Sequence, residues 1–212
     1  MTPEKKDTPW MDVHLTKEVM NYLWDIINNP IQPTTDAKGT LAGNISKSEF
    51  IKDKDNWFYE KVLKEMSEYL FYKNSWSSYF DVNIAKTKPP PIFTLKSLWV
   101  NYQKQHEFNP PHNHAGLYSF VVFMKIPTHW KEQYELPWLK GVNHPQASDF
   151  QFLFGHGDGR VEPTSPAGGQ ISLSPEDEGR MLFFPSWLAH QVFPFYGTEE
   201  ERITISGNII WN

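Results

Sequence analysis

Three histidines in the second half of the chain have the spacing of a metal site. His112 and His114 are separated by one residue, just before the apolar stretch 117–126. In extended backbone, residues two apart point to the same side, so both imidazoles can reach one ion. His190 follows a predicted strand and a proline turn, which can bring it to the same ion. Imidazole binds iron, zinc, copper and nickel, and three such ligands leave coordination positions open.

An arginine follows these histidines at a distance that allows it to join the same pocket. Arg202 lies twelve residues beyond His190 and begins the stretch Arg-Ile-Thr-Ile-Ser. This polar–apolar alternation predicts a strand in which Arg202 and Thr204 share the face toward the pocket. A guanidinium in that position can grip a carboxylate in bidentate fashion. The alternative for Arg202 is a surface ion pair with Glu199 or Glu200.

A carboxylate could replace one of the three imidazoles as a metal ligand. His156-Gly-Asp158 is a literal His-x-Asp sequence, so Asp158 is an alternative third ligand. The glycines around it favour a turn, either in a lid over the pocket or in a solvated hairpin. Glu107 is a further acidic residue that could reach the site. The other histidines are expected to be structural: His14, His106, His129 and His144.

The elements that must position these residues are predicted to be short strands. Aromatic and β-branched stretches separated by glycine and proline turn signals predict strands at 93–102, 117–126, 150–154, 168–173, 180–184, 190–193 and 202–206. Before them, amphipathic helices are predicted at 14–29 and at about 54–73. This order indicates a mainly β sandwich or barrel with helices on one side. We expect one domain over 1–212, with a helical part at 1–90 and the β core at 91–212, interrupted by long loops at 127–149 and 155–179.

Composition limits the classes of partner. The 212 residues carry a net charge of −5, which gives no basic footprint for nucleic acid. No cysteine is present, so thiolate metal sites and disulfides are excluded. No run of about 18 apolar residues predicts a membrane span. The chain is expected to be cytoplasmic, with a small-molecule or peptidyl substrate, and its oligomeric state stays open.

Several of these segments together resemble one enzyme family. The stretch from Tyr102 to His114 is similar to the first metal-binding segment of the prolyl-4-hydroxylase-like 2-oxoglutarate/Fe(II) oxygenases. The stretches 179–190 and 202–208 resemble the second half of that site. Within this branch, Trp99-Val-Asn101 adds a likeness to a group of uncharacterised oxygenases. The resemblance covers about residues 95–212 and, more loosely, Leu41-Ala-Gly-Asn-Ile45.

The resemblance implies a fold, cofactors and residue roles. The fold would be a double-stranded β-helix, or jelly roll, with the N-terminal helices packed on one side. By this resemblance His112 and His190 would bind Fe(II), and Arg202 would bind the distal carboxylate of 2-oxoglutarate. The spacing of the histidines makes His114 the expected third ligand of the iron. Thr204, Tyr102 and Asn101 would assist at this cosubstrate. The implied reaction decarboxylates 2-oxoglutarate to succinate, consumes O2 and hydroxylates an unidentified substrate.

The sequence departs from the family pattern at the third ligand. His114 stands where an aspartate is usual, and Gln105 stands where a glycine is usual. Three neutral imidazoles leave the ferrous site with one more positive charge than two imidazoles and a carboxylate. Two other functions therefore remain open: a three-His metal dioxygenase of the cupin type that does not use 2-oxoglutarate, and a non-catalytic jelly roll that binds a ligand.

Overall fold

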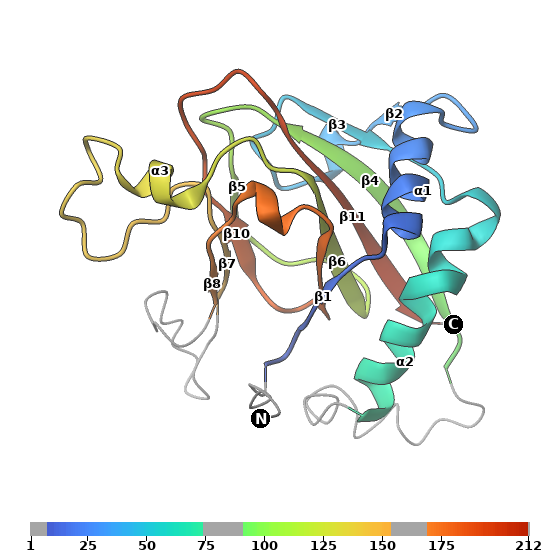
Figure 1. The fold of residues 1–212 in the computed structure, drawn as a ribbon. Helices are drawn as coiled ribbons and strands as arrows, with labels where there is room; N and C mark the ends of the chain where they lie inside the picture. Colours follow the sequence, from blue (N-terminus) through green and yellow to red (C-terminus); the bar gives the residue numbers. More distant parts are fainter. Residues whose placement is uncertain (1–7, 74–90, 154–168, 212) are drawn as a thin grey trace.

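The computed structural model describes residues 8–73, 91–153 and 169–211, which form two antiparallel sheets with helices against the larger one (Figure 1). The larger sheet has the order β1–β9–β6–β11–β4–β3–β2, with strands Met11–His14 (β1), Arg180–Pro185 (β9), Tyr118–Lys125 (β6), Arg202–Trp211 (β11), Phe93–Gln103 (β4), Lys47–Phe50 (β3) and Thr35–Asp36 (β2). The smaller has the order β5–β10–β7–β8, with strands Asn109–His112, His190–Val192, Phe150–Phe152 and Gln170–Ile171. The predicted mainly β fold is confirmed.

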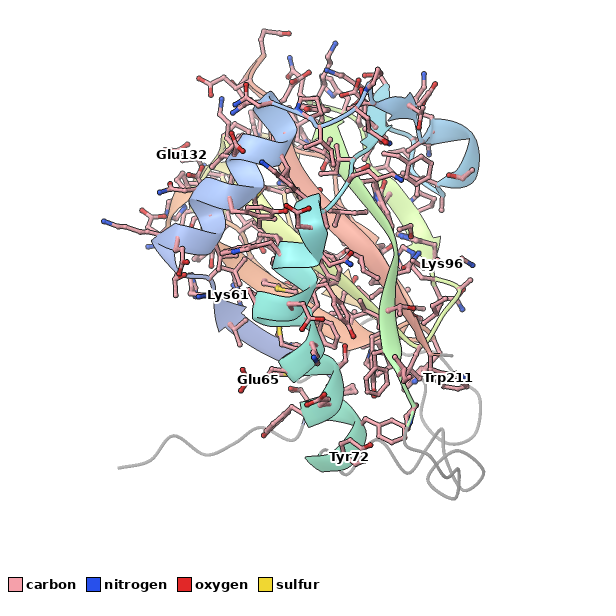
Figure 2. All side chains as sticks on the ribbon, turned by 90° about the vertical axis from the view of Figure 1, so that its right-hand side faces the viewer. Lys61, Glu65, Tyr72, Lys96, Glu132 and Trp211 are labelled. Atoms are coloured by element: carbon pink, nitrogen blue, oxygen red, sulfur yellow. The ribbon has the colours of Figure 1, made fainter. Side chains whose placement is uncertain are left out.

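Two helices cover the outer face of the larger sheet (Figure 2). The α1 helix (Lys17–Asn28) begins at Thr16, whose side chain accepts a hydrogen bond from the Val19 amide. The α2 helix (Lys64–Lys73) continues a π-helical turn, η3 (Tyr59–Leu63). Three short elements complete the helical content: η1 (Lys38–Thr40), η2 (Lys54–Asn56) and η5 (Pro175–Asp177). The predicted start of the first helix at residue 14 is wrong, because Met11–His14 pairs with β9 instead.

Strands β6 and β9 lie between two cores. On β6, Phe120 and Val122 contact the core under the helices, whereas Val121 and Phe123 face the core between the sheets. Successive side chains of a strand point to opposite faces, so a strand that is covered on both sides is apolar at most positions. This explains why the stretch 117–126 is apolar on both faces, apart from Ser119 and Lys125, and does not alternate.

Strand β11 runs through the centre of the larger sheet, between β4 and β6. It continues to Trp211, beyond the predicted end at residue 206, and pairs with β4 along its length. Gly207 permits this close packing, because an added Cβ would lie 2.6 Å from both Phe120 Cζ and the Ser97 carbonyl oxygen. Cross-strand pairs place Arg202 opposite Gln103 and Thr204 opposite Asn101.

Strand β5 forms one edge of the smaller sheet and contains two prolines, Pro110 and Pro111. Proline has no amide hydrogen, so in sheets it is confined mainly to edge strands. Neither β5 nor β3 was predicted from the sequence. The loop 127–149 contains a short helix, α3 (Trp130–Tyr134), and projects from the body of the two sheets (Figure 1). None of the helices in the described residues combines the length and hydrophobicity needed to cross a lipid bilayer.

Candidate functional site

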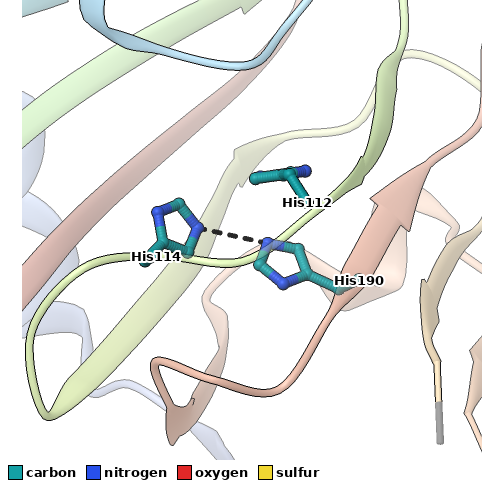
Figure 3. Close-up of side chains that lie close together, drawn as sticks. All are labelled: His112, His114 and His190. Atoms are coloured by element: carbon teal, nitrogen blue, oxygen red, sulfur yellow. Dashed lines mark hydrogen bonds between the residues drawn. The ribbon is translucent and has the colours of Figure 1, made fainter.

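The three predicted histidines meet between the two sheets (Figure 3). His112 ends β5, His190 begins β10 directly opposite it, and His114 lies in the segment after β5. The His114 amide donates to the carbonyl oxygen of Ser186 at 2.9 Å, which fixes this segment. One potential ligand nitrogen from each histidine lies within 4.8 Å of the other two. The convergence expected from the sequence is therefore present in the fold.

Hydrogen bonds to backbone carbonyls orient two of the imidazoles. His112 Nδ1 lies 2.7 Å from the Pro110 carbonyl oxygen, and His190 Nδ1 lies 3.1 Å from that of Leu188. A carbonyl oxygen can only accept, so each Nδ1 carries the hydrogen and each Nε2 presents a lone pair. His114 Nε2 lies 3.3 Å from His190 Nε2 (dashed line in Figure 3). These two nitrogens can share one proton from His114, or both can donate lone pairs to a cation.

Burial keeps the three imidazoles neutral. Desolvation lowers the pKa of His112, and it lowers the pKa of His114 to about 4 with a smaller contribution from the charge of His112. The pKa of His190 falls well below its ordinary value, first by burial and then by the charges of the other two. Phe150 stacks on the His190 ring, with centroids 5.3 Å apart. Neutral imidazole is the form that binds metal, so the cluster is ready for an ion at neutral pH.

The donor set fits Fe(II), and it also fits other first-row metals that prefer nitrogen ligands. No Asp or Glu is among the described residues that line the cavity around the cluster. Glu107, considered from the sequence, is not a ligand, because its carboxylate accepts hydrogen bonds from the amides of Ser46 and Lys104. The alternative ligand Asp158, with His156, lies outside the described residues. In the described part of the chain, His114 is therefore the third side chain that could bind the same ion.

A cavity of about 260 Å³ extends from the histidines between the sheets. One wall comes from β4 and β11, the strands that carry Asn101 and Thr204, and another from the segment 38–45. The wall of β4 and β11 is polar because alternate residues of the two paired strands face inward. Its polar residues are Asn101, Gln103, Arg202, Thr204, Ser206 and Asn208.

Arg202 lies in this wall as a fully buried cation. Its Nη2 donates to the carbonyl oxygen of Ser148 at 2.8 Å and to the Ser148 hydroxyl at 2.6 Å. Its Nη1 reaches Gln103 Oε1 only at 3.5 Å, and its Nε has no hydrogen-bond partner among the described residues. Burial lowers the pKa of Arg202 to about 10, and the charge of Asp149 partly opposes this shift. The guanidinium thus stays charged at neutral pH and keeps donors for an anion.

Two expectations about Arg202 require correction. It does not form a surface ion pair, since it has no exposed surface, while Glu199 bonds to Gln105 and Glu200 pairs with Lys125. In this arrangement, Arg202 also cannot bind a carboxylate in bidentate fashion. A guanidinium can bind a carboxylate through two parallel hydrogen bonds at either of two edges, and both edges include Nη2. Ser148 accepts both hydrogens of that nitrogen.

Of the other predicted cosubstrate residues, Thr204 and Asn101 line the cavity and Tyr102 does not. Asn101 Nδ2 approaches Thr204 Oγ1 at 3.5 Å, and Ser48 Oγ donates to Asn101 Oδ1 at 2.7 Å. Tyr102 lies on the opposite face of β4, where it packs against the core under the helices and beneath the Lys47 ammonium. The prediction for Tyr102 is wrong because adjacent residues of a strand point to opposite faces.

Sequence reasoning missed a buried polar group behind Arg202. Asp149 is fully buried, and its Oδ2 accepts hydrogen bonds from the Tyr134 hydroxyl and from Gln170 Nε2, while its Oδ1 has no partner. Burial raises the pKa of Asp149 to about 6, against the lowering effect of these hydrogen bonds and of Arg202. Nothing in the local sequence Ala-Ser-Asp-Phe signals that Ser148 and Asp149 lie behind Arg202.

Comparison with known proteins points to one family. A family model described as "Putative 2OG-Fe(II) oxygenase" matches residues 97–208, which is more than half of the chain. The matched region contains the three histidines, Arg202 and Thr204. No curated protein gives a significant match to the sequence.

Solved structures share the fold at low sequence identity. A prolyl-4-hydroxylase from Pseudomonas putida has a TM-score of 0.50 and 13% identity, over 96% of this chain and 91% of that one. The viral collagen prolyl hydroxylase of Paramecium Bursaria Chlorella virus-1 has a TM-score of 0.52 and 14% identity, over 95% and 96%. The epimerase SnoN has a TM-score of 0.54 and 13% identity, over 96% and 78%. The two sheets thus form the jelly roll that was predicted.

Proposed function

The chain belongs to the 2OG-Fe(II) oxygenase family, and from this we propose that it hydroxylates a substrate C–H bond at a three-histidine Fe(II) centre. In the overall reaction, substrate, 2-oxoglutarate and O2 give hydroxylated substrate, succinate and CO2. The observation that carries the proposal is the convergence of three neutral imidazoles beside a buried arginine with free donors.

His112, His114 and His190 are the proposed ligands of the iron. Bound Fe(II) would supply the centre at which 2-oxoglutarate and O2 react. The carbonyl oxygens of Pro110 and Leu188 hold the hydrogens of His112 and His190 at Nδ1, so that both Nε2 lone pairs point toward the ion. Apolar rings around His190, among them Phe150, exclude water from this side.

Arg202 and Thr204 are the proposed partners of the distal carboxylate of 2-oxoglutarate. A single charged donor of Arg202, the unpartnered Nε or the weakly bonded Nη1, would bind this carboxylate, because the hydrogens of these two nitrogens diverge. The Thr204 hydroxyl lies on the same face of β11 and can add a neutral hydrogen bond. Asn101, held by Ser48, would orient the Thr204 hydroxyl.

The substrate is proposed to be a small molecule or a single side chain of a peptide. A cavity of about 260 Å³ is small compared with the roughly 300–1,000 Å³ of typical ligand pockets, and 2-oxoglutarate has to share it. Hydroxylation of a prolyl residue, the activity for which two proteins of similar structure are named, is one reaction of this size class. We also propose that the protein is cytoplasmic and that its substrate is not a nucleic acid.

A second function is favoured by the third histidine. The cavity has no described carboxylate ligand, and a three-His dioxygenase that does not use 2-oxoglutarate would have such a ligand set. Arg202 would then bind a carboxylate of the substrate itself. The two functions differ in one measurable property, the binding of 2-oxoglutarate to the iron-loaded protein.

Anaerobic addition of Fe(II) and then 2-oxoglutarate tests the proposal. We expect a weak visible metal-to-ligand charge-transfer band, which His112→Ala and Arg202→Ala should both lose. Succinate should form from 2-oxoglutarate after O2 is admitted. Iron binding without the band would instead favour the second function.

The third ligand needs its own comparison. His114→Ala and Asp158→Ala should be measured side by side for iron affinity. We expect a loss of iron affinity in the His114 variant and little change in the Asp158 variant. The opposite result would assign the third position to the carboxylate.

A further inference from the structure

Ser148 is the buried member of a small group of residues with an unfavourable backbone conformation. Within the described residues, four non-glycine residues have positive φ, and Ser148 (φ 72°) is the buried one among them. A serine in this left-handed region is strained, whereas glycine adopts it freely. We therefore expect the Ser148 side chain to make an interaction that offsets this strain.

The contribution of Ser148 is a double contact with one nitrogen of Arg202. Its carbonyl oxygen and its hydroxyl both accept hydrogen bonds from Nη2, at 2.8 and 2.6 Å. A glycine would retain the carbonyl contact and relieve the strain, so the hydroxyl is what serine adds. That hydroxyl also lies 3.2 Å from the hydroxyl of buried Thr128. The Ser148 amide donates to the Pro194 carbonyl oxygen, which ties Ser148 to the backbone beyond β10.

Ser148 itself does not line the cavity, whereas Arg202 does. The serine thus holds the guanidinium from behind. A guanidinium has five hydrogens, and the two on Nη2 are taken by Ser148. The three that remain belong to Nε, which has no partner, and to Nη1, which has one weak contact with Gln103.

We propose that Ser148 is a positioning residue for cosubstrate binding. It fixes the rotation of the Arg202 guanidinium, so that a hydrogen on Nε or on Nη1 is held in place as a single charged donor for the distal carboxylate of 2-oxoglutarate. A flexible arginine would have to be ordered when the anion binds, and Ser148 removes that requirement. This inference rests on the proposed function, because it assumes that Arg202 binds the cosubstrate.

The test is the affinity of the iron-loaded protein for 2-oxoglutarate, measured anaerobically from the charge-transfer band. Ser148→Gly removes the hydroxyl without backbone strain, and Ser148→Ala removes it with the strain retained. We expect both variants to bind 2-oxoglutarate about three- to tenfold more weakly, the fold-change that corresponds to one lost hydrogen bond. Their affinity for Fe(II) should stay within about twofold of the native value, whereas general damage to the fold would lower both affinities.

Two results would overturn the positioning role. Unchanged affinity in Ser148→Gly would show that the hydroxyl is not needed. Tighter binding would show that the hydroxyl competes with the cosubstrate for an Nη2 hydrogen. Ser67→Ala is the matched control, because Ser67 is an equally buried serine in α2 that bonds to the Leu63 carbonyl oxygen.

Arg202→Ala separates this inference from the proposed function. If Arg202→Ala binds 2-oxoglutarate as the native protein does, the proposed role of Arg202 is wrong. If Arg202→Ala loses binding while Ser148→Gly keeps it, only the positioning role of Ser148 is wrong.

Discussion

His190 of β10 lies directly opposite His112 of β5 in an antiparallel pair, with ring centroids 4.3 Å apart. Two of the three histidines are therefore held together by the backbone hydrogen bonds of a sheet and do not depend on loop conformation. His114, two residues after His112, completes the group from the segment that bonds to Ser186. The pairing of β5 with β10 therefore fixes the relative positions of the His112 and His190 side chains.

Removal of one histidine should abolish stabilisation by metal. A ligand at one hundred times its dissociation constant stabilises a folded protein by about 2.7 kcal/mol. We expect Fe(II) or Zn(II) to raise the Tm of the native protein and to leave that of His190→Ala unchanged, measured by thermal unfolding without oxygen. His144→Ala, which alters an exposed histidine outside the cluster, should respond like the native protein. Equal stabilisation of His190→Ala would contradict the proposed site.

Neighbouring residues on opposite faces of the larger sheet should differ in their effect on cosubstrate binding. Thr204→Val keeps the shape of the side chain and removes a hydroxyl that faces the cavity, so we expect the KM for 2-oxoglutarate to rise about three- to tenfold. Tyr102→Phe should leave this KM within about twofold, because Tyr102 packs on the helical side. The measurement is succinate formation at varied 2-oxoglutarate. A larger effect of Tyr102→Phe would refute the assignment of faces.

A methyl group at Gly207 should disturb the centre of the larger sheet. An added Cβ would lie 2.6 Å from the Ser97 carbonyl oxygen and from Phe120 Cζ, so the backbone or the ring has to move. We expect Gly207→Ala to lower the free energy of unfolding by about 1–3 kcal/mol, as overpacking of cores does. Chemical denaturation measures this change. Gly39→Ala is the control, because no atom lies within 4 Å of a Cβ there, and its unfolding free energy should match the native value.

The buried carboxyl of Asp149 should give the protein a distinct pH dependence. Burial raises its pKa from 3.8 to about 6, so between these values the folded state binds more protons than the unfolded state. Stability attributable to this group is then present at low pH and is lost as the pH rises through that window.

Asp149→Asn isolates this effect, since the amide oxygen can still accept from Tyr134 and Gln170. The unfolding free energy of the native protein minus that of the variant should fall as pH rises from about 4 to about 6. The slope should be at most about 1.4 kcal/mol per pH unit, and the difference should be level above that range. Denaturation series at several pH values measure it. A difference that increases with pH would show that the carboxylate is favoured by the fold.

Local rules predicted the parts of the site that depend on strand periodicity. The one-residue spacing of His112 and His114 correctly predicted that both imidazoles face the same ion site. The alternation from Arg202 to Thr204 correctly predicted that both side chains face the cavity. The same rule could have excluded Tyr102, since Asn101 and Tyr102 are adjacent in one strand and cannot both face the cavity.

The remaining features depend on contacts between distant segments. Ser148 meets Arg202 only because the segment before β7 crosses the start of β11, and no motif in the sequence records this contact. Strand β5 escaped prediction because its two prolines are unfavourable in most strands. The end of β11 was predicted too early because Gly207 interrupts the alternation of polar and apolar residues. The glycine allows the neighbouring strands β4 and β6 to approach β11 closely.

Strand β5 has a consequence for how the molecule meets other chains. It is the outermost strand of the smaller sheet, and at Pro110 and Pro111 it has no amide hydrogen to offer an incoming strand. A second copy, or an extended segment of another protein, therefore cannot continue the sheet beside His112 by regular pairing. The edge next to His112 is therefore a poor template for pairing with another strand.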